Sequence, residues 1–165
     1  MVDQYDTLSS EARIQDPGFL DDLQRRASID ALSGLLNRAA MEYSIKERLK
    51  AMAPEAPCAL FIIDLDNFKQ VNDTLGHLAG DQAIRQAGRI VSGLFHASDV
   101  VGRLGGDEFA AFLCGQISEE LVRTKAAAIC ENLHLALGDR EIVNVTASVG
   151  IHLAGPGQEF DGLYQ

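Results

Sequence analysis

Residues 100–112 place two short apolar runs on either side of the tetrapeptide Gly-Gly-Asp-Glu at 105–108. Adjacent glycines can adopt the positive φ angles of a tight turn and allow another group to approach the backbone closely. The pattern therefore predicts a β-hairpin with two carboxylates at its tip. Neighbouring carboxylates repel each other unless positive charge lies beside them, so a divalent cation is the natural partner of this turn.

A second constraint comes from residues 58–63, an uninterrupted apolar run that ends at Asp64. Such a run is typical of a strand buried on both faces of a sheet. Ligands and chemistry often gather at the carboxyl end of a central strand. Because a strand end and a neighbouring hairpin tip can meet, Asp64 and Asp107 are candidates for a single site.

The remaining elements follow from helical and strand periodicity. Apolar stripes predict a helix after Asp16-Pro17, and further helices that begin at Asn37, Asp81 and Ser118 and end near Pro54, Phe95 and Gly138. A last strand is expected from Ile142 to about Leu153, and residues 65–80 are interpreted as a loop. This order favours an α/β (α+β) fold in which helices flank a largely antiparallel central sheet, rather than a doubly wound parallel sheet.

Composition limits the functional classes. A chain of 165 residues suits one domain with its own core, and its three cysteines, odd in number and set in apolar sequence, favour neither a disulfide framework nor a zinc site. The net charge of −10 argues against a nucleic-acid surface. The longest apolar run is far shorter than the roughly 20 residues that span a bilayer. We therefore expect no membrane contact by this segment and a cytoplasmic location, alone or as part of a larger sensor protein.

Three stretches carry motifs in a fixed order: DALSGLLNR at 30–38, DLDNFKQVNDTLGHLAGD at 64–81 and RLGGDEF at 103–109. Together they resemble the GGDEF family of diguanylate cyclases. The resemblance implies the palm-like, ferredoxin-like core of nucleotidyl cyclases. It divides the chain into a linker or signalling helix at 1–29 and a GGDEF domain at 30–165. The helix would carry a signal from an upstream sensor or receiver domain. The alternative for the first segment is a solvated helix packed on its own domain.

The resemblance also implies a reaction. The 3′-hydroxyl of one GTP attacks the α-phosphorus of another, pyrophosphate leaves, and two such steps give cyclic di-GMP, so a homodimer is needed for catalysis. Asp64, Asp107 and the backbone carbonyl of Leu65 match the ligands of Mg²⁺ or Mn²⁺, with two ions per active half-site. Asp107 and Glu108 match the residues that deprotonate or orient the attacking hydroxyl. A lone acid at a strand end is more often simply solvated, and Asp66 is interpreted as structural rather than as a ligand.

The substrate-binding positions are carried over in the same way. Asn72 and Asp81 match the guanine-reading positions, and a carboxylate and an amide suit the donor and acceptor edge of guanine. Lys69 matches a position near the phosphates, and the glycines Gly105 and Gly106 allow close approach of the phosphates. Without the resemblance, Asn72 would be an ordinary turn residue, Asp81 a helix cap and Lys69 a surface charge.

Two departures from the family pattern modify these expectations. The inhibitory product site of the family uses Arg-x-x-Asp before the turn, whereas this chain has His96 and Asp99 there, so we expect weak or absent product inhibition. The family pattern also continues into a final helix beyond EFDGLYQ at 159–165, so we expect a domain lacking that helix and poor turnover by this chain.

The sequence leaves two alternative functions open. The first is a catalytically impaired GGDEF domain that acts as a GTP-binding or protein-interaction module. The second is a class III nucleotide cyclase, which the GGDEF turn and the N-D-x-x-G-H loop disfavour.

Overall fold

The computed structural model describes residues 27–53, 56–138 and 142–154. The helix expected after Asp16-Pro17 and the EFDGLYQ segment lie outside these residues. The described elements follow in the order β1 (Leu36–Asn37), α3 (Arg38–Ala51), β2 (Cys58–Asp66), α4 (Phe68–Leu75), α5 (His77–Leu94), β3 (Val100–Gly105), β4 (Glu108–Cys114), α6 (Glu119–Asn132), β5 (Leu135–Leu137) and β6 (Val143–Ala154).

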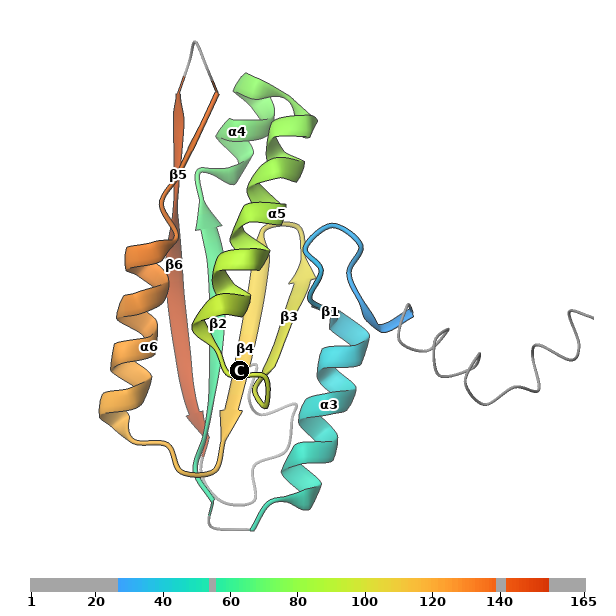
Figure 1. The fold of residues 1–165 in the computed structure, drawn as a ribbon, viewed down its shortest axis with the longest axis vertical. Coiled ribbons are helices and arrows are strands. Elements are labelled where there is room, and N and C mark those ends of the chain that lie inside the picture. The colour runs from blue at the N-terminus through green and yellow to red at the C-terminus, as the bar shows by residue number, and fades with distance from the viewer. Residues whose placement is uncertain (1–26, 54–55, 139–141, 155–165) are drawn as a thin grey trace, which may run out of the picture.

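The strands form one six-stranded sheet in the order β1-β3-β4-β2-β6-β5. Every neighbouring pair is antiparallel except β1 with β3. The expected largely antiparallel sheet flanked by helices is therefore confirmed. Figure 1 shows that the end of β2, the β3–β4 turn and the start of α5 lie toward the same end of the molecule.

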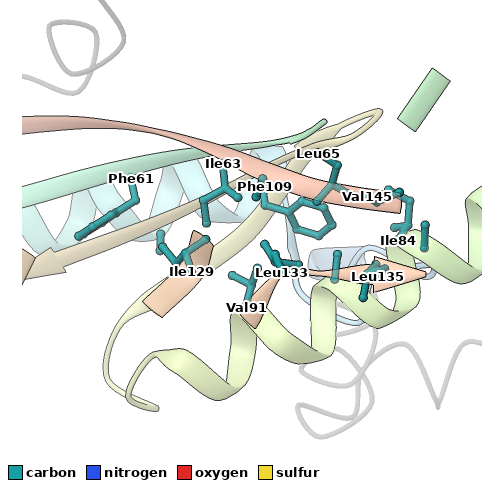
Figure 2. Packing of buried hydrophobic residues seen from close by; sticks show 14 of the residues in the cluster. Phe61, Ile63, Leu65, Ile84, Val91, Phe109, Ile129, Leu133, Leu135 and Val145 are labelled. Atoms are coloured by element: carbon teal, nitrogen blue, oxygen red, sulfur yellow. The ribbon is translucent and has the colours of Figure 1, made fainter. Parts of the chain in front are cut away.

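The central strand β2 is buried from both sides, as its continuous apolar sequence predicts. Phe61, Ile63 and Leu65 belong to the main core with residues of α4, α5 and α6, and Phe61 meets Phe95 edge to face at 5.7 Å between ring centroids. Figure 2 shows several side chains of this core. Leu60 belongs to a second cluster on the opposite face, against α3. Packing on both faces fixes where β2 ends and hence where Asp64 lies.

Two of the expected helix starts are confirmed by their caps. The Asn37 side chain accepts a hydrogen bond from the backbone N–H of Ala40 at 3.0 Å, and the Ser118 hydroxyl accepts one from Leu121 at 3.1 Å. Each side chain thereby satisfies one backbone donor of a first helical turn. Met41 and Ile45 of the expected stripe in α3, and Val122 and Ile129 of that in α6, are buried.

The expected loop at 65–80 was wrong, because it contains the helix α4 and the start of α5. Val71 of α4 is fully buried in the main core. A few apolar residues at helical spacing therefore anchor this mostly polar segment as a helix. Asp81 does not cap a helix, since α5 begins four residues earlier, after Gly76 with φ +83°. A left-handed glycine lets one helix end and the next begin without an intervening loop.

Two short strands are not predicted by the sequence pattern. The helix expected to end near Gly138 ends at Asn132, and β5 follows it directly. Leu135 and Leu137 are buried while Ala136 is exposed, an alternation too short to identify as a strand before its partner β6 is known. The other missed strand is the two-residue β1, which pairs with β3.

Among the described residues, no helix is long and apolar enough to cross a membrane.

Candidate active site

The turn between β3 and β4 has the backbone that its glycines predict. Gly105 has φ +147° and Gly106 has φ +54°, values that residues with a side chain rarely adopt. The pairing of the two strands shifts between Arg103 and Gly105, so the end of β3 is irregular where the turn begins. This backbone presents the half-buried Asp107 and the exposed Glu108 at the end of the sheet.

The structure brings Asp64 together with this turn. Asp64 on β2 lies directly opposite Glu108 on β4 in the antiparallel register. The next residue, Leu65, donates its backbone N–H to the carbonyl oxygen of Asp107 at 3.3 Å. The N–H and C=O of one strand residue point to the same side, so the Leu65 carbonyl also faces the turn. Directly opposite residues place their side chains on the same face of the sheet.

The electrostatics of Asp64 reflect these neighbours. Desolvation, followed by the negative charges of Asp107, Glu108 and Asp66, raises the pKa of the Asp64 carboxyl above its ordinary value. The folded chain thus gathers acidic groups that repel one another. A cation beside Asp64 would relieve that repulsion and favour the ionised carboxylate.

The donors at this end of the sheet suit a hard divalent cation. In the part of the chain that the structure describes, no three His, Cys, Asp or Glu side chains lie close enough to hold a metal by themselves. Mg²⁺ does not need such a cage, because proteins usually bind it through one or two carboxylates together with waters and substrate phosphates. Asp64, Asp107 and the Leu65 carbonyl are the oxygen donors at this end of the sheet that could hold such an ion.

Asp66 occupies a different role from Asp64, although only one residue separates them. Its two carboxylate oxygens accept hydrogen bonds from the hydroxyls of Thr146 at 2.6 Å and Ser148 at 2.7 Å, both on β6. These two hydrogen bonds hold the pKa of Asp66 below its usual value. The carboxylate is therefore committed to joining β2 and β6.

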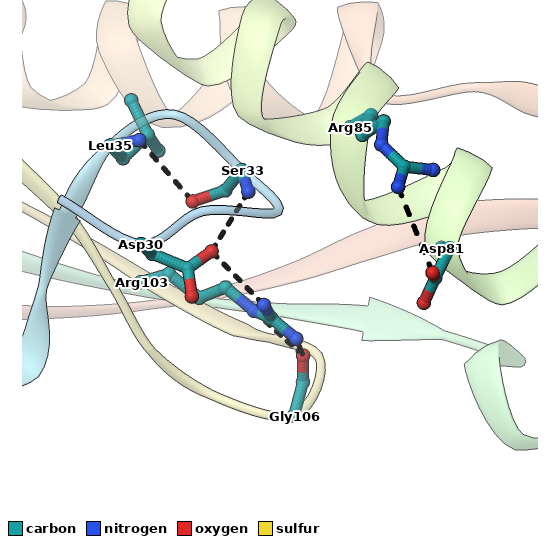
Figure 3. Close-up of polar contacts among 7 residues, drawn as sticks. All are labelled: Asp30, Ser33, Leu35, Asp81, Arg85, Arg103 and Gly106. Carbon is teal, nitrogen blue, oxygen red and sulfur yellow. Dashed lines mark hydrogen bonds and ion pairs between the residues drawn. The ribbon is translucent and has the colours of Figure 1, made fainter.

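Arg103 was not singled out from the sequence, yet it supports the turn (Figure 3). Its Nε and Nη2 donate to the carbonyl oxygen of Gly106 at 3.0 and 2.7 Å, and its Nη1 donates to Asp30 at 3.0 Å. The same Asp30 oxygen accepts the backbone N–H of Ser33 at 2.8 Å. The available signal was an arginine shortly before a glycine turn, whose exposed carbonyls need donors.

Three of the residues expected to bind substrate lie on α4 and α5, whereas Gly105 and Gly106 lie at the turn between β3 and β4. Asn72 and Lys69 belong to α4, and Asp81 to α5. The Asn72 carboxamide lies against Gly80, the residue before Asp81, so these two candidate guanine contacts are near one another. Asp81 forms a long ion pair with Arg85, 3.8 Å between Oδ2 and Nη2. Both side chains are about half exposed to solvent, so this pair is weak. Lys69 is exposed.

The expected inhibitory position forms a self-contained turn. The backbone N–H of His96 donates to the Asp99 carboxylate at 2.8 Å, and the Asp99 N–H donates to the His96 carbonyl at 2.8 Å. The His96 ring Nδ1 lies 2.8 Å from the Ser98 hydroxyl. This turn lines a groove of about 770 Å³, which is also lined by Tyr43 and Arg48 of α3.

Comparison with known proteins gives a consistent result. Residues 27–165 match the family model described as "Diguanylate cyclase, GGDEF domain". The probable diguanylate cyclase DgcE of Escherichia coli strain K12 is 37% identical over 137 residues, which is 81% of this chain and 12% of that relative. The chain spans less than half of the length of each of the first curated relatives that it matches.

Solved structures agree with these matches. The GGDEF domain of TpbB, also named YfiN, from Pseudomonas aeruginosa is 36% identical with a TM-score of 0.67, and the match covers 76% of this chain and 74% of that one. The GGDEF domain of DgcB from Caulobacter crescentus, solved in complex with c-di-GMP, is 27% identical with a TM-score of 0.71 and 84% coverage of both chains. The shared architecture is the palm fold of nucleotidyl cyclases.

Proposed function

Because the chain belongs to the GGDEF domain family of diguanylate cyclases, we propose that it condenses two GTP molecules into cyclic di-GMP and releases two pyrophosphates. The observation that best supports this activity is the meeting of Asp64 with Asp107 and Glu108 at the end of the central strand. Phosphoryl transfer builds negative charge on phosphate oxygens, and a group of carboxylates that needs a cation provides a place to neutralise it.

GGDEF cyclases generally depend on a divalent metal. In the proposed site, Asp64, Asp107 and the Leu65 carbonyl would hold Mg²⁺ or Mn²⁺, two ions in each half-site. When bound, the metal stabilises the charge that develops on the transferring phosphate and orients its oxygens. Asp107, with Glu108, would orient the attacking 3′-hydroxyl and accept its proton.

The protein's own groups bind and orient the substrate. Asn72 and Asp81 read the guanine edge, and Lys69 lies toward the triphosphate. Gly105 and Gly106 have no side chains, so the phosphates can approach the turn backbone closely. Guanine offers two donors and an acceptor along one edge, which an Asp carboxylate and an Asn carboxamide can satisfy together.

Each new bond joins two GTP molecules, so the reaction requires two protomers whose sites face each other as an antiparallel homodimer. GTP is the substrate and cyclic di-GMP the product in this proposal, which places the domain in the cytoplasm under the control of an upstream sensor or receiver domain.

The experiment that tests this function is incubation of the chain with GTP and Mg²⁺, followed by separation of the nucleotides by chromatography. Asp107→Ala is the variant that removes a proposed ligand. Glu131→Gln is the matched control, because it removes an exposed carboxylate from α6. We expect cyclic di-GMP from the parent and from Glu131→Gln, and none from Asp107→Ala.

Two other outcomes identify the alternatives. GTP binding without product would favour the impaired GGDEF domain that serves as a binding or interaction module. Conversion of a single nucleotide to its own 3′,5′-cyclic form would contradict the diguanylate cyclase and favour a class III cyclase.

A further inference from the structure

The corner between α4 and α5 is built from residues at intervals of four. The backbone N–H of Gly76 donates to the carbonyl of Asn72 at 3.0 Å, and the N–H of Gly80 donates to the carbonyl of Gly76 at 3.3 Å. These two bonds fix how the first turn of α5 lies beside the last turn of α4. Asn72 and Gly80 therefore face each other across the corner.

The contact between them is unusually close. A Cβ atom built on Gly80 would lie 2.1 Å from Oδ1, 3.0 Å from Cγ and 3.4 Å from Nδ2 of Asn72. All three atoms are those of the carboxamide, so this group lies directly over the space where another residue would have its side chain. Side-chain carbon atoms do not approach other heavy atoms to 2.1 Å, so no residue with a Cβ fits here without moving Asn72.

A glycine inside a helix has a cost. It destabilises a helix interior by about 1 kcal/mol relative to alanine. Gly93, near the other end of α5, has open space where its Cβ would be. Gly80 is buried and has a specific neighbour, so its contact gives it a role that Gly93 lacks.

We propose that Gly80 is a specificity-positioning residue, whose missing side chain sets the Asn72 carboxamide in the orientation that recognises guanine. This inference rests on the proposed function, in which Asn72 reads the base. Gly80 does not itself touch the nucleotide in this scheme, and it acts only through Asn72. The preference for GTP over ATP should therefore depend on Gly80 to the same extent as it depends on Asn72.

We expect the fold to tolerate the change that tests this role. The atom nearest to an added Cβ is the end of a half-buried side chain and not a backbone atom. Rotation of Asn72 about its side-chain torsions relieves the overlap at a cost below that of moving either helix. Gly80→Ala should thus leave α4 and α5 in place and displace the carboxamide.

The test compares the affinities of the chain for non-hydrolysable analogues of GTP and ATP with Mg²⁺, measured by calorimetry. The variants are Gly80→Ala, Asn72→Ala and the double variant, with Gly93→Ala as the matched glycine control in the same helix. Loss of the guanine hydrogen bonds should reduce the preference for the GTP analogue by about tenfold in each single variant. The double variant should lose no more than Asn72→Ala alone, and Gly93→Ala should keep the preference.

The outcomes separate the two proposals. If the parent chain shows no preference for the GTP analogue, the proposed function and this inference both fail. If the parent prefers it and Gly80→Ala keeps that preference, only the inference fails. If Gly80→Ala does not fold, the double variant should fold again because the overlapping carboxamide is gone, and a double variant that stays unfolded also overturns the inference.

Discussion

Arg103 on β3 and Asp30 in the loop before β1 form an ion pair 3.0 Å long, although they lie 73 positions apart. The side chains are only 14% and 26% exposed. Because the same guanidinium donates twice to the Gly106 carbonyl, Arg103 joins the first described loop to the turn that carries Asp107. Figure 3 shows the guanidinium lying between these two segments.

Replacing Arg103 should loosen that turn. We expect Arg103→Ala to lower kcat by about 10- to 100-fold, because small misplacement of a reacting group has such effects, and to destabilise the fold by about 1–3 kcal/mol, as for hydrogen bonds to charged groups. Arg103→Lys should recover only part of both, since an ammonium cannot donate in the same planar arrangement. Arg38→Ala, which breaks an exposed pair with Glu42, is the control.

The pair also has a pH signature. Partial burial of Asp30 acts to raise its pKa, but hydrogen bonds from Ser33 and Arg103 outweigh it and hold the pKa below the ordinary value. The stability from this lowered pKa is present above the ordinary carboxyl pKa of about 4 and is lost as pH falls through the lower folded value. The stability difference between parent and Arg103→Ala should therefore shrink in acid. Denaturant unfolding at pH 7 and pH 3 measures it, and an unchanged difference would contradict this assignment.

Asp64→Asn should stabilise the chain while abolishing cyclase activity. Desolvation and then the neighbouring carboxylates raise the pKa of Asp64, so its stabilising contribution exists below the unfolded pKa and is lost as pH rises through the folded value. At pH 7 without metal, the neutral amide removes that repulsion. We expect Tm to rise by roughly 1–3 °C, a small value because Asp64 is exposed.

Metal titration distinguishes this effect from a general one. Mg²⁺ should raise the Tm of the parent, because it binds the folded state, and should leave Asp64→Asn nearly unchanged. A lower Tm for Asp64→Asn at pH 7, or an equal response to Mg²⁺, would contradict the placement of Asp64 in a metal site.

The elements that the sequence predicts well are those with long, one-sided or two-sided apolar patterns. The buried strand that carries Asp64, the hairpin around Gly105 and the capped helix at Asn37 all have local signals strong enough to decide their structure. α4 was missed because polar residues such as Asn72 and Asp73 dominate it and only Val71 is buried. β1 and β5 depend on partners distant in the chain, which periodicity cannot identify.

The residues of the candidate site also differ in whether a local sequence signal predicts them. The motifs predict Asp64 and Asp107 as site candidates, because carboxylates at a strand end and in a glycine turn are visible in one sequence. The contacts of Arg103 with Asp30, and of Gly80 with Asn72, depend on segments that only the fold brings together. A supporting contact of this kind has no pattern in the sequence. The supporting roles of Arg103 and Gly80 were therefore not predicted.

Gly88→Ala should destabilise the fold, in contrast to the change proposed at Gly80. A Cβ on Gly88 would lie 2.6 Å from the backbone oxygen of Ser33, in the loop that holds Asp30. A backbone atom cannot rotate away, so the loop or α5 must shift. Overpacking of this kind costs about 1–3 kcal/mol. Chemical denaturation measures it, with Gly93→Ala as the control, and a Gly88→Ala chain as stable as that control would refute the close approach.

We expect His96→Arg to create a product site at the position where this chain has no arginine. The parent uses Asp99 to accept the His96 backbone N–H, and an imidazole ring cannot donate the bidentate pair of hydrogen bonds that a guanidinium donates. We expect the parent to bind cyclic di-GMP weakly at this position and His96→Arg to gain at least about tenfold in affinity, as two charge-assisted hydrogen bonds provide. His96→Lys should gain less, because its ammonium acts as a point charge.

Calorimetric titration with the product measures each variant, and Asp99→Ala added to His96→Arg should remove the gain. Micromolar binding by the parent that disappears in Asp99→Ala alone would show that the site already functions without the arginine.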